Sequence, residues 1–243
     1  MKHLKTIMSV LTVLVALSCT KSQTEGNGQV SFQISSKLDV AEQTRSSVSD
    51  YTALPSAGDF TISITDESSA PVWSGKISDW DPATLLPAGN YTVTATYGAL
   101  EDEGFNKPFF TGTKAFVING GQTTAVSVSV SLGNTIVKVA CTNNFKNYYK
   151  DYTFKIVRGG SDVVTFAKGE TKAAFVDGYK FTLTGTLKSE TSTKTFEKEY
   201  SSLDEATAYT FEFDVTNVGG ASITVTFNNN VEVINLDDLE LNE

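Results

Sequence analysis

The sequence predicts an all-β protein made of two tandem immunoglobulin-like β-sandwiches of the Greek-key type. Three observations predict this fold class. Apolar residues alternate with Ser and Thr over most of the chain, turns containing Gly or Asn recur about every ten residues, and the order of strand motifs in the first half is repeated in the second. A period of two places apolar side chains on one face of a strand and polar ones on the other. No segment carries a helical period over more than about two turns.

Residues 1–18 are predicted to be a secretory signal peptide. Lys2 and Lys5 precede an apolar run from Ile7 to Leu17, about half of the roughly 20 residues that a membrane helix needs. Ser18 then precedes Cys19, and a small residue before a cysteine at this place resembles the lipobox of bacterial lipoproteins. The resemblance implies cleavage before Cys19, acylation of its sulfur and attachment to a membrane of the cell envelope. We expect this membrane to be the outer membrane. A plain signal peptide with an incidental cysteine is the alternative.

Behind Cys19, residues 19–29 are predicted to form a polar, flexible tether, and two sandwich domains are expected at 30–133 and 134–243. The predicted strands are the segments in which apolar and polar residues alternate and in which Thr, Val and aromatic residues are frequent. They centre on Val30–Ile34, Phe60–Ile64, Tyr91–Tyr97 and Val126–Val130 in the first half, and on Phe181–Leu183, Phe211–Val215 and Ile223–Phe227 in the second.

Composition and charge exclude several classes of function. The chain has 243 residues and a formal net charge of −9 without a basic cluster, which argues against a nucleic acid partner. His3 is the single histidine and lies in the predicted signal peptide, so no histidine-based nucleophile system or metal site is expected in the mature protein. No phosphate-binding glycine loop is present. We therefore expect no enzymatic activity and no cofactor.

Three aromatic residues and one acidic loop are the candidate binding residues. Trp73, Trp80 and Tyr97 could stack on a sugar ring where they are exposed, whereas packing in the core is the other role for the two tryptophans. The loop "GALEDEGFN" places Glu101, Asp102 and Glu103 together, where carboxylates could bind Ca²⁺ or simply be solvated.

The remaining cysteine and one arginine complete the set of candidate residues. Cys141 has the same parity as Val137 and Val139, which predicts an inert thiol in the core. Arg45 is one of two arginines in the chain and follows the first predicted strand. Its position between strands predicts a solvated loop residue.

Three segments carry a family resemblance. "PAGNYTVTATYG", "GFNKPFFTGTKAFVINGGQTTAVSVSVSLGNTIVKV" and "NNFKNYYKDYTFKI" together resemble a domain-of-unknown-function family of Bacteroidetes lipoproteins, which is distantly similar to fimbrillin-like sandwiches. The residues that carry the resemblance have the character of turn and core positions; they are Pro87, Gly89, Tyr91, Gly104, Phe105, Pro108, Phe109, Gly112 and Gly121.

The resemblance implies a non-catalytic cell-envelope lipoprotein with an adhesive, binding or structural role. Its expected partners are the membrane, through the lipid on Cys19, and a glycan or a protein. One alternative is a glycan-binding accessory lipoprotein of polysaccharide uptake, which needs an exposed aromatic platform. Another is a pilin-like subunit, in which cleavage after Arg45 would free a groove that accepts a strand.

Overall fold

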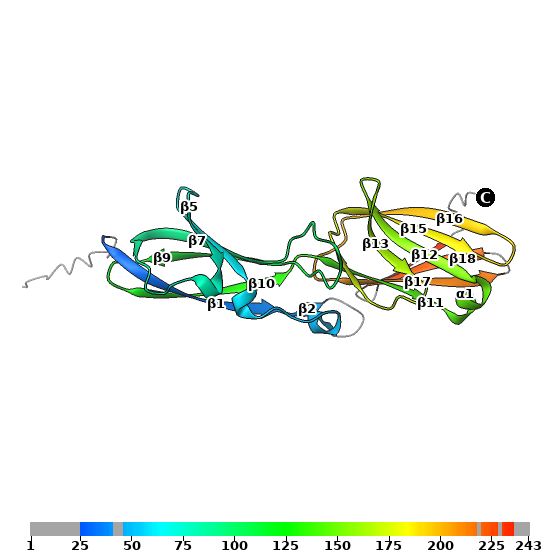
Figure 1. Ribbon diagram of the computed structural model, residues 1–243, viewed down its shortest axis with the longest axis horizontal. Helices are drawn as coiled ribbons and strands as arrows, with labels where there is room; N and C mark the ends of the chain where they lie inside the picture. The colour runs from blue at the N-terminus through cyan, green and yellow to red at the C-terminus, as the bar shows by residue number, and fades with distance from the viewer. Residues whose placement is uncertain (1–24, 41–45, 218–219, 228–229, 236–243) are drawn as a thin grey trace, which may run out of the picture.

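The computed structural model describes residues 25–40, 46–217, 220–227 and 230–235. Over these residues the molecule is elongated and consists of two β lobes placed end to end, as Figure 1 shows. The predicted signal peptide, Cys19 and Arg45 lie outside the described residues. The all-β prediction is confirmed by an element order in which strands strongly predominate.

The first lobe contains a seven-stranded sheet in the order β5-β4-β7-β9-β10-β1-β6. The bounds of its strands are β1 Asn27–Lys37, β4 Thr61–Asp66, β5 Pro71–Lys76, β6 Leu86–Pro87, β7 Gly89–Tyr97, β9 Phe110–Ile118 and β10 Thr123–Leu132. The register pairs β9 with β10 only at Phe110 with Leu132 and Thr111 with Ser131. The strands β9 and β10 therefore diverge beyond these two pairs. The core of the first lobe lies between β5-β4-β7-β9 on one side and β10-β1-β6 on the other.

Shorter elements fill the connections of this lobe. β2 (Asp39–Val40) pairs with β3 (Ser46–Ser47), and β3 leads into the 3-10 helix η1 (Val48–Asp50). Two further 3-10 helices follow, η2 (Ala57–Asp59) and η3 (Ile77–Asp79).

The second lobe is a sandwich of two sheets. One sheet has six strands in the order β19-β18-β17-β11-β14-β8, and the other has four in the order β13-β12-β15-β16. Their bounds are β8 Gly104–Phe105, β11 Thr135–Cys141, β12 Asp151–Arg158, β13 Ser161–Ala167, β14 Ala174–Val176, β15 Lys180–Lys188, β16 Thr193–Ser201, β17 Ala208–Asn217, β18 Gly220–Phe227 and β19 Asn230–Asn235. β8 lies in the loop between β7 and β9 of the first lobe, so this six-stranded sheet contains strands from both halves of the chain.

The α-helix α1 (Asn143–Tyr148) follows β11 and begins where Thr142 Oγ1 accepts a hydrogen bond from the Phe145 amide at 3.2 Å. At six residues it agrees with the prediction of no long helix. Within the described ranges no helix is long and apolar enough to cross a membrane.

Alternation of apolar and polar residues produces the two cores. In β10, Val126, Val128 and Val130 are buried while the serines between them are exposed, as a period of two requires. One hydrophobic cluster fills the first lobe and another fills the second. Phe175 and Ala208 come from the second half of the chain but pack in the first cluster. The core of the first lobe thus continues into the junction between the lobes.

Candidate functional site at the junction loop

The loop between β7 and β9, residues 98–109, leaves and re-enters the first lobe and contacts the second lobe through β8. Contacts between its own residues hold its two ends together. Gly98 has φ +72°, and a Cβ atom there would lie 2.5 Å from the carbonyl oxygen of Pro108. A side chain is therefore excluded where the two ends of the loop approach each other. Asp102 Oδ2 lies 2.8 Å from Lys107 Nζ across the loop. The amide of Phe109 donates a hydrogen bond to Asn134 Oδ1 on the segment that joins β10 to β11.

A cavity of about 420 Å³ opens in this loop. It is lined by Tyr97, Gly98, Ala99, Asp102, Asn106, Lys107 and Pro108. Tyr97 is half-buried, and its ring lies 5.8 Å from that of Phe60, measured between centroids, so the core holds the tyrosine in place. A sugar ring presents an apolar face, which an aromatic ring can contact, and hydroxyl groups, which carboxylate, amide and ammonium groups can bind. The lining combines these groups in a cavity of the size that small ligands occupy.

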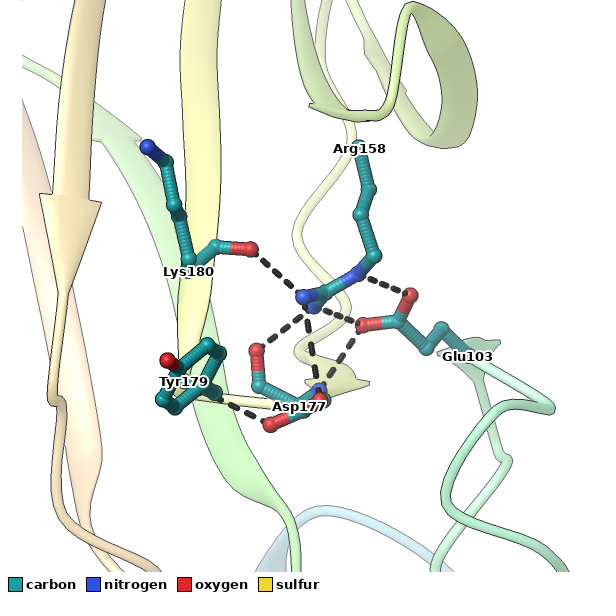
Figure 2. Close-up of polar contacts among 5 residues, drawn as sticks. All are labelled: Glu103, Arg158, Asp177, Tyr179 and Lys180. Atoms are coloured by element: carbon teal, nitrogen blue, oxygen red, sulfur yellow. Dashed lines mark hydrogen bonds and ion pairs between the residues drawn. The ribbon is translucent and has the colours of Figure 1, made fainter.

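Glu103, which follows Asp102 in this loop, forms hydrogen bonds and an ion pair with residues of the second lobe (Figure 2). Its carboxylate accepts hydrogen bonds from Arg158 Nε at 3.0 Å, from Arg158 Nη2 at 2.8 Å and from the amide of Asp177 at 2.8 Å. The guanidinium of Arg158 also donates to the carbonyl oxygens of Asp177, at 2.7 Å, and of Lys180. Two parallel N–H···O bonds make this a bidentate pair, which is the strongest geometry for an arginine and a carboxylate.

Burial strengthens this ion pair. The side chain of Glu103 is 5% exposed and that of Arg158 is 28% exposed, so water screens the pair less than it would a surface pair. The hydrogen bond to Glu103 raises the pKa of Arg158 above its usual range, although burial acts in the opposite direction. The guanidinium therefore stays charged.

Backbone and aromatic contacts hold the same junction. Phe105 of β8 pairs with Ala174 of β14, and its ring packs edge-on against Phe166, 5.4 Å away between centroids. On another side of the junction, Lys138 Nζ lies 5.6 Å from the ring centroid of Tyr51. Contacts therefore bring the junction loop and the segment around Tyr51 against the second lobe.

Two of the three candidate Ca²⁺ ligands of the acidic loop, Asp102 and Glu103, form ion pairs within the chain. Glu103 is bound by Arg158 and Asp102 by Lys107, so a lysine or arginine of the chain already neutralises each of these two carboxylates. Within the part of the chain that the structure describes, no cluster of three or more His, Cys, Asp or Glu side chains could hold a metal ion.

The two tryptophans lie together in the first lobe. Trp80 is 7% exposed, and its Nε1–H donates to the carbonyl oxygen of Val30 at 3.0 Å. Trp73 is half-buried, and its ring packs edge-on against Trp80, 5.1 Å away between centroids. Trp80 therefore packs in the core of the first lobe, which is the other role considered for it. Of the three aromatic candidates, Tyr97 alone lines the cavity in the junction loop.

Cys141 lies in the second lobe, away from the junction loop. It is half-buried and lines a cavity of about 360 Å³ together with Tyr152, Phe154 and Phe166. Burial raises the pKa of the Cys141 thiol to about 11, while hydrogen bonding to Tyr152 and the charge of Lys146 act in the opposite direction. The thiol is therefore protonated near neutral pH and is a poor nucleophile.

Sequence reasoning missed Arg158 and Asp177, which complete the junction. The acidic loop and the scarcity of arginine were the available signals, because a carboxylate that is buried needs a cation. The sequence does not show which cation approaches the loop, since Arg158 lies 55 residues from Glu103.

Several solved structures are similar to this chain. A fimbrial assembly protein from Parabacteroides distasonis has a TM-score of 0.49 and 9% identity, over 87% of this chain and 98% of that one. A DUF1812 protein from Bacteroides thetaiotaomicron has a TM-score of 0.44 and 10% identity, over 86% and 98%. For the fimbrial anchor protein of Porphyromonas gingivalis the values are 0.39 and 8%, over 84% and 98%. No curated protein matches the sequence.

One family profile spans both lobes and the junction loop. It matches residues 26–239, which include every strand described above. The resemblance drawn from the three sequence segments is thus confirmed, and the chain belongs to the family described as "Domain of unknown function (DUF4493)".

Proposed function

We propose that this protein is a non-catalytic, lipid-anchored component of the cell envelope that binds glycans through the cavity of the junction loop. The observation that carries the proposal is the lining of this cavity, in which Tyr97 lies beside Asp102, Asn106 and Lys107. An aromatic ring surrounded by groups that bind hydroxyls is suited to a saccharide.

The rigid support of the cavity favours a binding or adhesive role. The loop that forms it is held by the Glu103–Arg158 pair and by the pairing of β8 with β14. Rigid placement of contact residues lowers the entropy that is lost on binding. We expect modest affinity, because one aromatic contact contributes only about 1 kcal/mol beyond its buried area.

A glycan array tests binding. The probe is the lipid-free chain, made with Cys19→Ser, and positive glycans are then titrated by calorimetry. Asp102→Ala should weaken binding about 3-fold to 10-fold through the loss of one hydrogen bond, and Tyr97→Ala about 5-fold. Glu101→Ala is the matched control, since Glu101 lies in the same loop but does not line the cavity.

Binding that is unchanged by Asp102→Ala and Tyr97→Ala would place the glycan elsewhere on the molecule. An array without any positive glycan would leave a structural or protein-binding role in place of the glycan-binding one. Thermal unfolding of each variant separates a loss of binding from a loss of folding, because Tyr97 also contacts Phe60.

Anchoring is tested separately. Cys19→Ser should move the protein from the membrane fraction to the soluble fraction and abolish labelling by a fatty-acid analogue, because the sulfur that carries the lipid is gone. Labelling that persists in Cys19→Ser would contradict the lipoprotein assignment, whatever the result of the glycan array.

A further inference from the structure

Parallel strand pairs connect the two ends of the molecule. β1 runs parallel to β10 over a register that extends from Gln29 opposite Thr123 to Lys37 opposite Ser131. β10 continues across the junction into β11, which runs parallel to β17 from Ile136 opposite Ala208 to Cys141 opposite Phe213. Figure 1 shows that β1 runs from the outer end of the first lobe toward the junction. In the second lobe the last described strand, β19, ends at Asn235, which pairs with Ser222 of β18, and Ser222 pairs with Asp214 near the end of β17.

Tension between the two ends would therefore act along these strands. It pulls β1 toward its N-terminal end, while β10 is pulled through β11 in the opposite direction. The two strands slide past each other only when all hydrogen bonds between them break together, because those bonds run across from one strand to the other. A hairpin pulled open from one end instead loses its bonds one after another.

Two hydrogen bonds of β1 define which of its backbone groups face β10. The amide of Gln29 donates to the carbonyl oxygen of Gln122 at 2.8 Å, whereas the carbonyl of Val30 is directed away from β10 and accepts from Trp80 Nε1 at 3.0 Å. In a parallel pair this alternation continues along the strand. The amide of Ser35 thus faces β10, and that of Ser36 faces the opposite edge.

The second parallel pair has the same arrangement. The amide of Ile136 donates to the carbonyl oxygen of Thr207 at 2.9 Å, and the amide of Thr142 donates to that of Phe213 at 2.9 Å. Both ends of the β11–β17 pair are therefore hydrogen-bonded. Beyond it, β18 pairs with both β17 and β19, so the load is passed on to the last described strand.

We propose that this chain is a force-bearing element, in which the β1–β10 and β11–β17 pairs carry tension along the long axis in shear. This function goes beyond ligand binding. The proposed anchor at Cys19 is needed only as the source of the tension. Resistance to that tension is a property of the folded lobes and does not depend on the anchor.

Single-molecule force spectroscopy tests the proposal. The full chain with Cys19→Ser and Cys141→Ser is pulled between tags at its two ends. In the comparison, the same chain with Gln122→Cys is pulled between the N-terminal tag and the new thiol, which lies at the start of β10. That geometry opens the β1–β10 pair from one end. We expect the end-to-end rupture force of the first lobe to be at least about twofold larger. Equal forces in the two geometries would overturn the proposal.

Adjacent serines of β1 offer a matched pair of substitutions. Ser35→Pro removes an amide that faces β10 and should lower the end-to-end rupture force about 1.3-fold. Ser36→Pro removes an amide that faces away from β10 and should lower this force less. Both side chains are exposed. Ser35→Ala controls for the contact between the hydroxyls of Ser35 and Ser129 at 3.2 Å. Equal rupture forces for the two proline variants would contradict shear at this pair.

The two pulling geometries need no proline, so the proposal is tested even where Ser35→Pro does not fold. A chain that binds glycans but ruptures at equal force in both geometries would overturn the mechanical function alone. A chain that resists shear but binds no glycan would overturn only the binding function.

Discussion

At the scale of single residues, the junction depends on a carboxylate that lies between the two lobes. Glu103 accepts hydrogen bonds from Arg158 and from the amide of Asp177, and it is almost completely buried. Removing one partner of a buried ion pair costs more than the pair itself contributes, because the other charge stays behind without compensation. Lys107 and Asp102 form an ion pair in the same loop, but both are exposed.

This difference predicts the effect of two substitutions. Arg158→Ala should lower the free energy of unfolding by about 3 kcal/mol, since Glu103 loses its cation. Lys107→Ala should lower it by less than about 1 kcal/mol, as expected for an exposed pair. Urea denaturation followed by circular dichroism measures both. Equal losses would mean that the Glu103–Arg158 pair is effectively solvated.

Cys141 allows a prediction on reactivity. Its pKa of about 11 means that the thiolate, which is the nucleophile, is scarce at pH 8. Alkylation by iodoacetamide at pH 8 should be on the order of 100-fold slower in the folded chain than in urea, followed by mass spectrometry. The folded chain keeps this proton while the unfolded chain loses it, so stability should fall as the pH rises from about 9 to about 11. Equal alkylation rates would show that the thiol is solvated.

At the scale of elements, the long strands could be predicted and the shortest could not. The period of two is visible over segments such as Thr123–Leu132, where it decides which side chains are buried. β8 has two residues and β14 three, which is too short for a periodic signal. The parallel partner of β11 is β17, which begins at Ala208, and no local pattern indicates pairing over such a separation.

The same limit applies to the candidate site. Tyr97 could be proposed as a sugar contact because aromatic residues suit that role, and the structure places it in a cavity. The role of Trp80 depends on the carbonyl of Val30, which is 50 residues away in the chain. The cation for Glu103 is equally remote. Residue type therefore indicates chemistry, whereas the partner is determined by tertiary structure.

The close approach of β9 and β10 leads to a prediction for this element. A Cβ atom on Gly112 would lie 2.1 Å from the carbonyl oxygen of Ser129, which is part of the backbone and cannot move aside easily. Gly112→Ala should therefore cost about 2 kcal/mol of folding stability. Gly89→Ala is the control, because a Cβ there would meet its nearest atom at 3.8 Å. Chemical denaturation of both variants measures the difference, and equal stability would mean that the strands can separate without cost.

At the scale of the whole molecule, the two lobes share structure at their junction. The first lobe contributes β8 to the sheet of the second, and the second contributes Phe175 and Ala208 to the core of the first. Each lobe nevertheless has a hydrophobic cluster that consists mainly of its own residues. The division into domains at 30–133 and 134–243 therefore stays a prediction that depends on whether one lobe folds alone.

A fragment that ends near Asn144 decides this question. It contains most of the first hydrophobic cluster and should unfold cooperatively, but it lacks Phe175, whose burial contributes about 1.5–3 kcal/mol. The fragment should therefore be less stable than the same lobe in the full chain by roughly that amount. Phe175→Ala in the full chain is the matched comparison, with an expected loss of about 3–5 kcal/mol. An unfolded fragment beside a folded full chain would show that the lobes form one continuous domain, because the first core would then require the second lobe to close it.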